Sequence, residues 1–181
     1  QGGHFVSGKF DQVARSVPYS ALIQVFRGLV GSVLAEPEER LAHTRAAVIA
    51  ALGQHAGVVA EVIPDVHLLI GPQAPPPPLD PTETATRFRR AFQQFVGAFG
   101  RPGQPLVLFL DDLQWADGAT LDLLHALLSD AAQRHLLVIG AYRDADVDEV
   151  HPVAVMAHKL ETAGADVRRL TLGPLSRASL G

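Results

Sequence analysis

The sequence predicts an α/β fold built on a parallel sheet, and two apolar runs carry this prediction. Leu106 to Leu110 is apolar without interruption and then meets Asp111 and Asp112, which is the pattern of a strand buried on both faces. Leu136 to Ala141 is a second run of this kind. Helical patterns lie between the strands, and that order implies right-handed crossovers and parallel strands. A buried helix over Leu106 to Leu110 is the alternative, which Pro105 and the Asp pair disfavour.

Composition narrows the class of protein further. The 181 residues fit one domain, and 48% hydrophobic with 19% charged residues is typical of a globular chain. No apolar run approaches the ~20 residues of a membrane span, and no signal-peptide pattern opens the chain. The absence of cysteine excludes disulfides and thiolate metal sites, and the eight histidines are scattered. A net charge of -4 gives no attraction to nucleic acid or to an anionic membrane.

The first segment, Gly3 to Phe10, imitates a phosphate-binding loop. Its GHFVSGKF sequence fits G-x-x-x-x-G-K, but Phe10 stands where a Ser or Thr hydroxyl is required to bind Mg²⁺. The residues between the two glycines favour an extended strand over a loop that wraps around phosphates. We therefore interpret this segment as a strand.

Apolar spacing of three and four residues predicts helices over residues 19–34, from residue 36 onward, over 80–99 and over about 119–134. The third of these opens with Asp80-Pro81 and Glu83, a capping residue followed by a first-turn proline and an acidic residue. Residues 71–81 form a proline-rich connection, either an extended surface loop or a docking motif for SH3-type domains. An apolar bias over 167–172 predicts a further strand.

Asp111 and Asp112 are the candidate functional residues. Parallel sheets bind ligands beyond the carboxyl ends of their strands, where this pair is expected. Two adjacent ionised carboxylates need a cation, a basic partner or water, so a solvated turn and a metal–nucleotide site both explain the pair. The second interpretation is the pattern of a Walker B strand in a phosphate-binding-loop (P-loop) NTPase. There the first Asp holds Mg²⁺ and the second acidic residue polarises the attacking water.

Arg143 is the third candidate, because it follows the strand at Leu136 to Ala141. From that strand end its guanidinium could reach a terminal phosphate. An ion pair with Asp144, Asp146 or one of the two central carboxylates is the alternative.

Taken together, these stretches resemble the ATPase module of the AAA/STAND superfamily. Within it they are most similar to the module of large bacterial proteins that join a serine/threonine kinase-like domain, this ATPase and a sensor histidine kinase. The matching stretches run in order along nearly the whole chain: FVSGKFDQ, VPYSAL, VIPDVHLLIG, DPTETATRFRRAFQQF, PLVLFLDDLQWAD, LLVIGAYRDADV and LTLGPLS.

The resemblance implies a three-layer parallel sheet of the P-loop NTPase type, with ATP and Mg²⁺ as cofactors. It makes Asp111 the Mg²⁺-associated residue, Asp112 the catalytic residue that activates water, and Arg143 a catalytic, nucleotide-binding sensor of the phosphate. Trp115 and Asp117 belong to the pattern, but no chemical role follows for them. It also implies a cytoplasmic protein whose partners are the kinase domains of the same parent chain, and it is compatible with a homo-oligomer.

The pattern is incomplete at the N-terminus. By resemblance, the first strand, the Gly-rich loop and the first helix precede Gln1, so residues 1–181 are expected to form a partial ATPase domain from the second to the fifth strand. Alone, this piece is expected to be inactive. Two functions remain open for the parent: an ATP-hydrolysing regulatory switch, or a degenerate ATPase fold that acts as a scaffold between kinase domains. A G-x-x-x-x-G-K-S/T sequence upstream would favour the switch.

Overall fold

The chain folds around a three-stranded parallel sheet in the order β1-β2-β3. The computed structural model describes residues 2–13, 17–78 and 80–173. The strands are β1 (His4–Lys9), β2 (Leu106–Asp111) and β3 (Leu136–Gly140). In the register of the sheet, Leu106 pairs with His4 on one side and with Leu136 on the other. All three strands and their parallel direction confirm the predicted α/β fold class.

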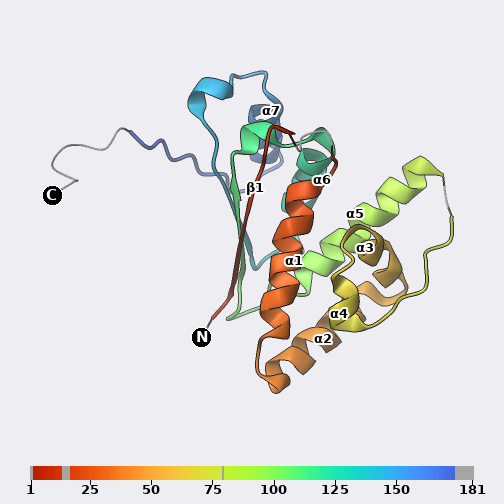
Figure 1. Cartoon of the computed structure of the whole chain (residues 1–181). Helices are drawn as coiled ribbons and strands as arrows, with labels where there is room; N and C mark the ends of the chain where they lie inside the picture. The colour runs from red at the N-terminus through yellow and green to blue at the C-terminus, as the bar shows by residue number, and fades with distance from the viewer. Residues whose placement is uncertain (1, 14–16, 79, 174–181) are drawn as a thin grey trace.

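Helices in the described ranges surround the sheet on one side and extend away from it (Figure 1). Helix α1 (Ser20–Leu34) packs on β1, and α4 (Val66–Ile70) packs on α1. Helices α2 (Glu38–Leu52) and α3 (Ala56–Val62) pack on α5 (Pro81–Gly97), and α6 (Gly118–Leu128) packs against α7 (Pro152–Thr162). No helix in the described part of the chain is long and apolar enough to cross a bilayer. The helices are α1 (Ser20–Leu34), α2 (Glu38–Leu52), α3 (Ala56–Val62), α4 (Val66–Ile70), α5 (Pro81–Gly97), α6 (Gly118–Leu128) and α7 (Pro152–Thr162), with 3-10 turns η2 (Gly53–His55), η3 (Leu113–Trp115) and η4 (Asp144–Asp146).

The core lies between the sheet and these helices. Leu106, Leu108 and Leu110 alternate along β2 and are completely buried on its helix-facing side, as the two-residue period of a strand requires. A row of phenylalanines crosses the helix layer, in which Phe26 of α1 meets Phe92 of α5 edge-on with ring centroids 5.1 Å apart. Such edge-to-face pairs fix how α1 crosses α5 beneath the sheet.

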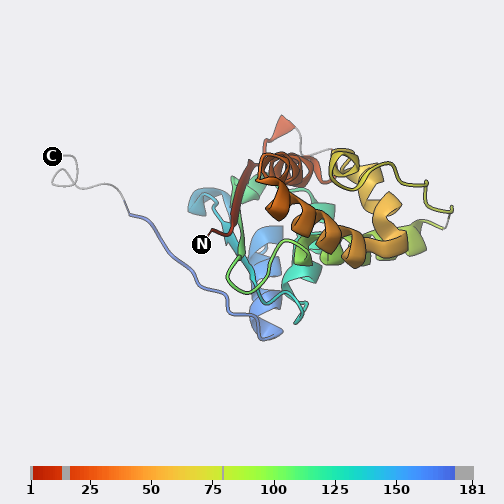
Figure 2. The ribbon, with the colours of Figure 1, turned by 90° about the horizontal axis from the view of Figure 1, so that it is seen from below.

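The opposite face of the sheet is not covered by helices of the described residues (Figure 2). The row formed by Phe5, Val107 and Leu137 lies on this face, and the side chains of Phe5 and Leu137 are 64% and 53% exposed. Ile139, in the next row, is also exposed. The expectation that these strands are buried on both faces is therefore not met within the described part of the chain.

The predicted strand over residues 167–172 is wrong. In the structure this segment has no regular secondary structure, and Leu170 and Leu172 are each 85% exposed. Apolar and β-branched residues favour an extended backbone, but a strand forms only where a neighbouring strand supplies hydrogen bonds. No described strand lies beside this segment. The last matching stretch, LTLGPLS, also runs past residue 173, so its end lies outside the described residues.

The helix predicted over about 119–134 is shorter than expected, because α6 ends at Leu128. The side chain of Asp130 accepts a hydrogen bond from the backbone N–H of Ala132 at 2.9 Å. This local turn gives the backbone an alternative to the helix. The chain then enters β3 at Leu136.

We expect His4 to make the stability of this fold depend on pH. Its ring is 9% exposed and packs edge-on against Phe99. Burial lowers the pKa of His4 below its ordinary value of 6.5, with Arg40 and Arg101 lowering it further and Glu36 opposing them. Because the folded state favours the neutral ring, the unfolded chain binds more protons, and stability should fall as the pH drops below about 6.5.

We therefore expect His4→Asn to be less stable than the unmutated chain but to lose part of this pH slope. The denaturant midpoint of unfolding between pH 7.5 and 5 measures it. His43→Gln, a change at an exposed position on α2, should keep the full slope. An unchanged slope in His4→Asn would show that His4 is not the responsible group.

Candidate functional site

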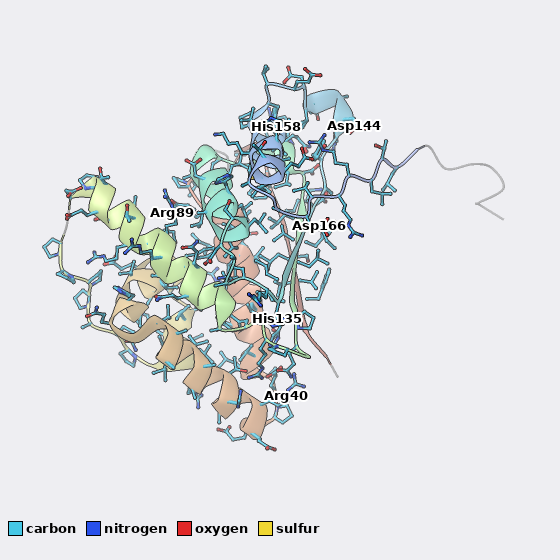
Figure 3. The ribbon with its side chains drawn as sticks, turned by 180° about the vertical axis from the view of Figure 1, so that it is seen from behind. Arg40, Arg89, His135, Asp144, His158 and Asp166 are labelled. Atoms are coloured by element: carbon cyan, nitrogen blue, oxygen red, sulfur yellow. The ribbon has the colours of Figure 1, made fainter. Side chains whose placement is uncertain are left out.

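Asp111 ends the central strand, where the three strands present their carboxyl ends. It is the last residue of β2 and lies beside Lys9, the last residue of β1. Its Oδ1 accepts a hydrogen bond from the backbone N–H of Asp112 at 3.0 Å. Figure 3 shows the molecule from behind, with His135 just before β3 and Asp144 beyond the carboxyl end of that strand. The candidate site lies at this carboxyl end. The predicted placement of Asp111 at a strand end is confirmed by this geometry.

Asp112 leaves the strand through a sharp change of backbone direction. Its φ of 55° and ψ of 43° lie in the left-handed region, which Asp tolerates better than most residues and which often marks functional positions. The backbone N–H of Leu113 donates to the carbonyl of Ala141 at 2.9 Å, so the turn is fastened to the end of β3. A Cβ on Gly140 would meet Cδ1 of Leu113, so a larger residue there would require this side chain to shift. The Asp112 side chain is only 13% exposed.

Lys9 completes a charged cluster with the two carboxylates. Its Nζ lies 2.9 Å from Oδ2 of Asp112 and 3.5 Å from Oδ2 of Asp111, while its side chain is 66% exposed. The hydrogen bond to Lys9, followed by one from Gln114, lowers the pKa of Asp112, and the contact with Asp112 raises the pKa of Lys9. Both groups are therefore charged at neutral pH, and the carboxylates are already neutralised in part.

Sequence reasoning missed Lys9 as a site residue. The rejection of Gly3 to Phe10 as a phosphate loop agrees with the structure, since His4 to Lys9 of this segment form β1. However, the carboxyl ends of parallel strands meet at one edge of a sheet, and Lys9 is the last residue of one such strand. The predicted strand assignment was therefore itself the signal that could have placed Lys9 beside Asp111.

Arg143 lies on the other side of Asp112. Its Nε is 3.7 Å from Oδ1 of Asp112, and its side chain is 71% exposed. The structure thus supports the ion-pair alternative, with Asp112 and not Asp144 or Asp146 as the partner. A contact this long and this exposed contributes little to stability. The guanidinium is therefore free to turn toward another anion at this edge.

Asp117 and Trp115 have structural roles. Asp117 caps α6, since its Oδ1 accepts from the backbone N–H of Thr120 at 2.8 Å and its Oδ2 from the hydroxyl of Thr120 at 2.6 Å. Oδ2 also accepts from the backbone N–H of Tyr19 at 3.3 Å, which ties the start of α1 to this loop. Trp115 is partly buried against the core. The Asp117 cap contributes about 1 kcal/mol to the stability of the fold.

The two carboxylates fit a metal ion that takes some of its ligands from the protein and the others from a nucleotide and water. In the described ranges no group of three or more Asp, Glu or His could hold a metal alone. Mg²⁺ keeps several waters and is usually bound by one or two carboxylates together with substrate phosphates. Asp111 is suited to this arrangement, because its side chain is 41% exposed at the open edge of the sheet.

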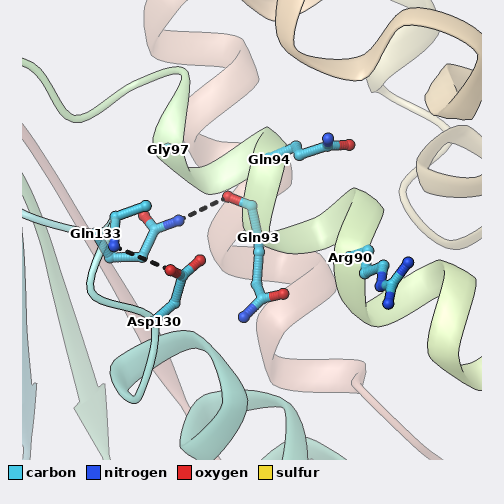
Figure 4. A pocket seen from close by; sticks show the side chains of 7 residues that line it. Arg90, Gln93, Gln94, Gly97, Asp130 and Gln133 are labelled. Atoms are coloured by element: carbon cyan, nitrogen blue, oxygen red, sulfur yellow. Dashed lines mark hydrogen bonds between the residues drawn. The ribbon is translucent and has the colours of Figure 1, made fainter.

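Two described hollows lie away from the carboxylates. One, of about 350 Å³, lies between α5 and the connection from α6 to β3, and Figure 4 shows its lining. There Gln133 donates from Nε2 to the carbonyl of Gln93 at 2.9 Å, which joins the two elements. The connection enters β3 at its amino end, so this hollow is at the opposite edge of the sheet from the carboxylates. Its glutamine amides are structural.

Comparison with known proteins agrees with this fold. Residues 1–139 match the AAA ATPase domain family, and the chain therefore belongs to that family. It is also 39% identical over 124 residues to hybrid signal transduction histidine kinase G of Dictyostelium discoideum, a match that covers 68% of this chain and 4% of that protein. No solved structure matches the chain significantly. The resemblance to an AAA-type ATPase module is confirmed.

Proposed function

We propose that the chain is part of an ATP-binding and ATP-hydrolysing switch in a multidomain signal-transduction protein. One observation carries the proposal: Asp111 and Asp112 stand at the carboxyl end of the central strand of a parallel sheet, with Arg143 beside them. The relative supports the regulatory setting, because its name is that of a hybrid signal transduction histidine kinase. The kinase domains of the parent chain would be the partners that the switch controls.

Each residue has a separate task in this mechanism. Asp111 would hold Mg²⁺, and the bound ion would supply positive charge against the charge that develops on the phosphates. Asp112 would orient and polarise the attacking water. Arg143 would leave its long contact with Asp112 and bind the terminal phosphate. Lys9 and Arg143 balance the two carboxylates before nucleotide arrives, and this reduces the repulsion that a polyphosphate would otherwise meet.

The phosphate cradle is proposed to come from another part of the parent chain. Most contacts to the β- and γ-phosphates in this class come from backbone N–H groups, a Lys and a Ser or Thr of a Gly-rich loop. The segment from Gly3 to Lys9 is not such a loop, since its residues His4 to Lys9 form β1. Residues 1–181 would accordingly be a partial domain that carries the catalytic carboxylates and the sensor.

The test is Mg²⁺-dependent ATP binding and hydrolysis by the whole parent protein. We expect saturable Mg·ATP binding and release of inorganic phosphate, both lost when EDTA removes Mg²⁺. A protein that binds no nucleotide, or binds it without measurable turnover, would contradict the switch. That outcome would instead favour a scaffold between kinase domains, and the exposed sheet face around Phe5 and Leu137 would then be the first surface to examine.

A further inference from the structure

Gln114 is a buried polar residue that packing does not explain. It lies in η3, one residue beyond Leu113, and is 2% exposed. Its Nε2 donates to Oδ1 of Asp112 at 3.0 Å. The other end of the amide, Oε1, is buried and has no hydrogen-bond partner among the described residues. The orientation of the amide is fixed by chemistry, because an ionised carboxylate only accepts hydrogen bonds.

A purely structural role does not account for this amide. Burying an acceptor without a partner opposes folding. A methionine at position 114 would fill a similar volume without that cost. Local rules of stability are broken most often at functional sites. Among the described residues, the only hydrogen-bond partner of this amide is the carboxylate of Asp112.

The hydrogen bond decides which way the Asp112 carboxylate faces. Oδ1 is held by the buried amide of Gln114 on the interior side. Oδ2 is left on the side of the exposed Lys9 ammonium, 2.9 Å away. The backbone of Asp112 is fixed as well, since its N–H donates to Asp111 and the next residue is bound to the end of β3. The carboxylate is therefore held from the interior by Gln114, while Lys9 at Oδ2 and Arg143, 3.7 Å from Oδ1, contact it from the exposed side.

We propose that Gln114 is a positioning residue, which holds the Asp112 carboxylate in the orientation that the attacking water requires. The inference rests on the proposed function. Catalytic groups lose much of their effect when they are misplaced by about 1 Å. Gln114 would act through Asp112, without contact to nucleotide.

The experiment compares Gln114→Met with the unmutated parent protein. We expect kcat for ATP hydrolysis to fall about 10-fold, while KM and the Kd for Mg·ATP stay within about twofold, because only transition-state alignment is lost. Gln133→Met is the matched control, since it removes a partly buried glutamine donor at the opposite edge of the sheet. It should leave kcat unchanged. Gln114→Glu keeps the size of the side chain and replaces the hydrogen-bond donor by an acceptor. It is the variant to measure if Gln114→Met lowers the melting temperature.

A double-mutant cycle separates positioning from general destabilisation. In an Asp112→Asn background, Gln114→Met should change kcat by less than about twofold, because the group through which it acts is already gone. A further 10-fold loss in the double variant, or an unchanged kcat in the single variant, would overturn the inference. If Asp112→Asn itself hydrolyses ATP at the unmutated rate, the proposed function fails and the inference fails with it. If Asp112→Asn lowers kcat and Gln114→Met does not, only the role of Gln114 is refuted.

Discussion

Asp112→Asn in the parent protein is expected to slow ATP hydrolysis at least ~10²-fold, the usual scale for the loss of a group that orients water or accepts its proton. The change keeps the shape of the side chain and removes only its charge. An asparagine Oδ1 can still accept the hydrogen bond that Gln114 now donates to Asp112. The turn at residues 111–113 should therefore be preserved, and Mg·ATP binding should survive.

Asp111→Asn separates metal binding from water activation. We expect it to weaken Mg²⁺-dependent nucleotide binding, because Asp111 is the more exposed carboxylate of the two and is the one placed to meet the ion. Asp122→Asn removes the same charge from an exposed position on α6 and should change neither property. Steady-state phosphate release and the Kd for Mg·ATP measure these effects.

An Asp112→Asn enzyme that turns over near the unmutated rate would refute the catalytic role of Asp112.

The central part of the site could be predicted because local and global patterns coincide there. An apolar run that ends in two Asp residues defines both the buried strand and the place where its charges must emerge. Arg143 could be predicted as a candidate in the same way, because it follows the next strand. The strand ends at Asp111 and Gly140, and the structure brings Arg143 to Asp112 as one of the stated alternatives.

Gln114 was not predictable in this manner. The residues around it read as a short loop, and no periodicity indicates that η3 turns its side chain into the core. Its burial follows from the left-handed backbone of Asp112 and from the bond between Leu113 and Ala141. Both are tertiary features. The same reasoning explains residues 167–172, whose sequence favours an extended chain but cannot state whether a partner strand is present.

Arg143→Ala is expected to leave the fold intact and to remove most of the discrimination between ATP and ADP. The guanidinium is 71% exposed and its contact with Asp112 is 3.7 Å long, so its loss should lower stability by no more than about 1 kcal/mol. A charge-assisted hydrogen bond to a terminal phosphate contributes about 1.5–3 kcal/mol. Its removal should therefore weaken ATP binding between about 10-fold and about 10²-fold while ADP binding changes little.

The measurement is the ratio of the Kd values for ADP and ATP, with the melting temperature as the check on folding. Arg134→Ala is the matched control, because Arg134 is an exposed arginine in the turn that leads into the opposite end of β3. It should leave the ratio unchanged. If Arg143→Ala lowers the melting temperature sharply and preserves the ratio, then Arg143 is a structural partner of Asp112. The phosphate would in that case be sensed elsewhere, and Lys9, a described cation that contacts both carboxylates, would be the next residue to replace.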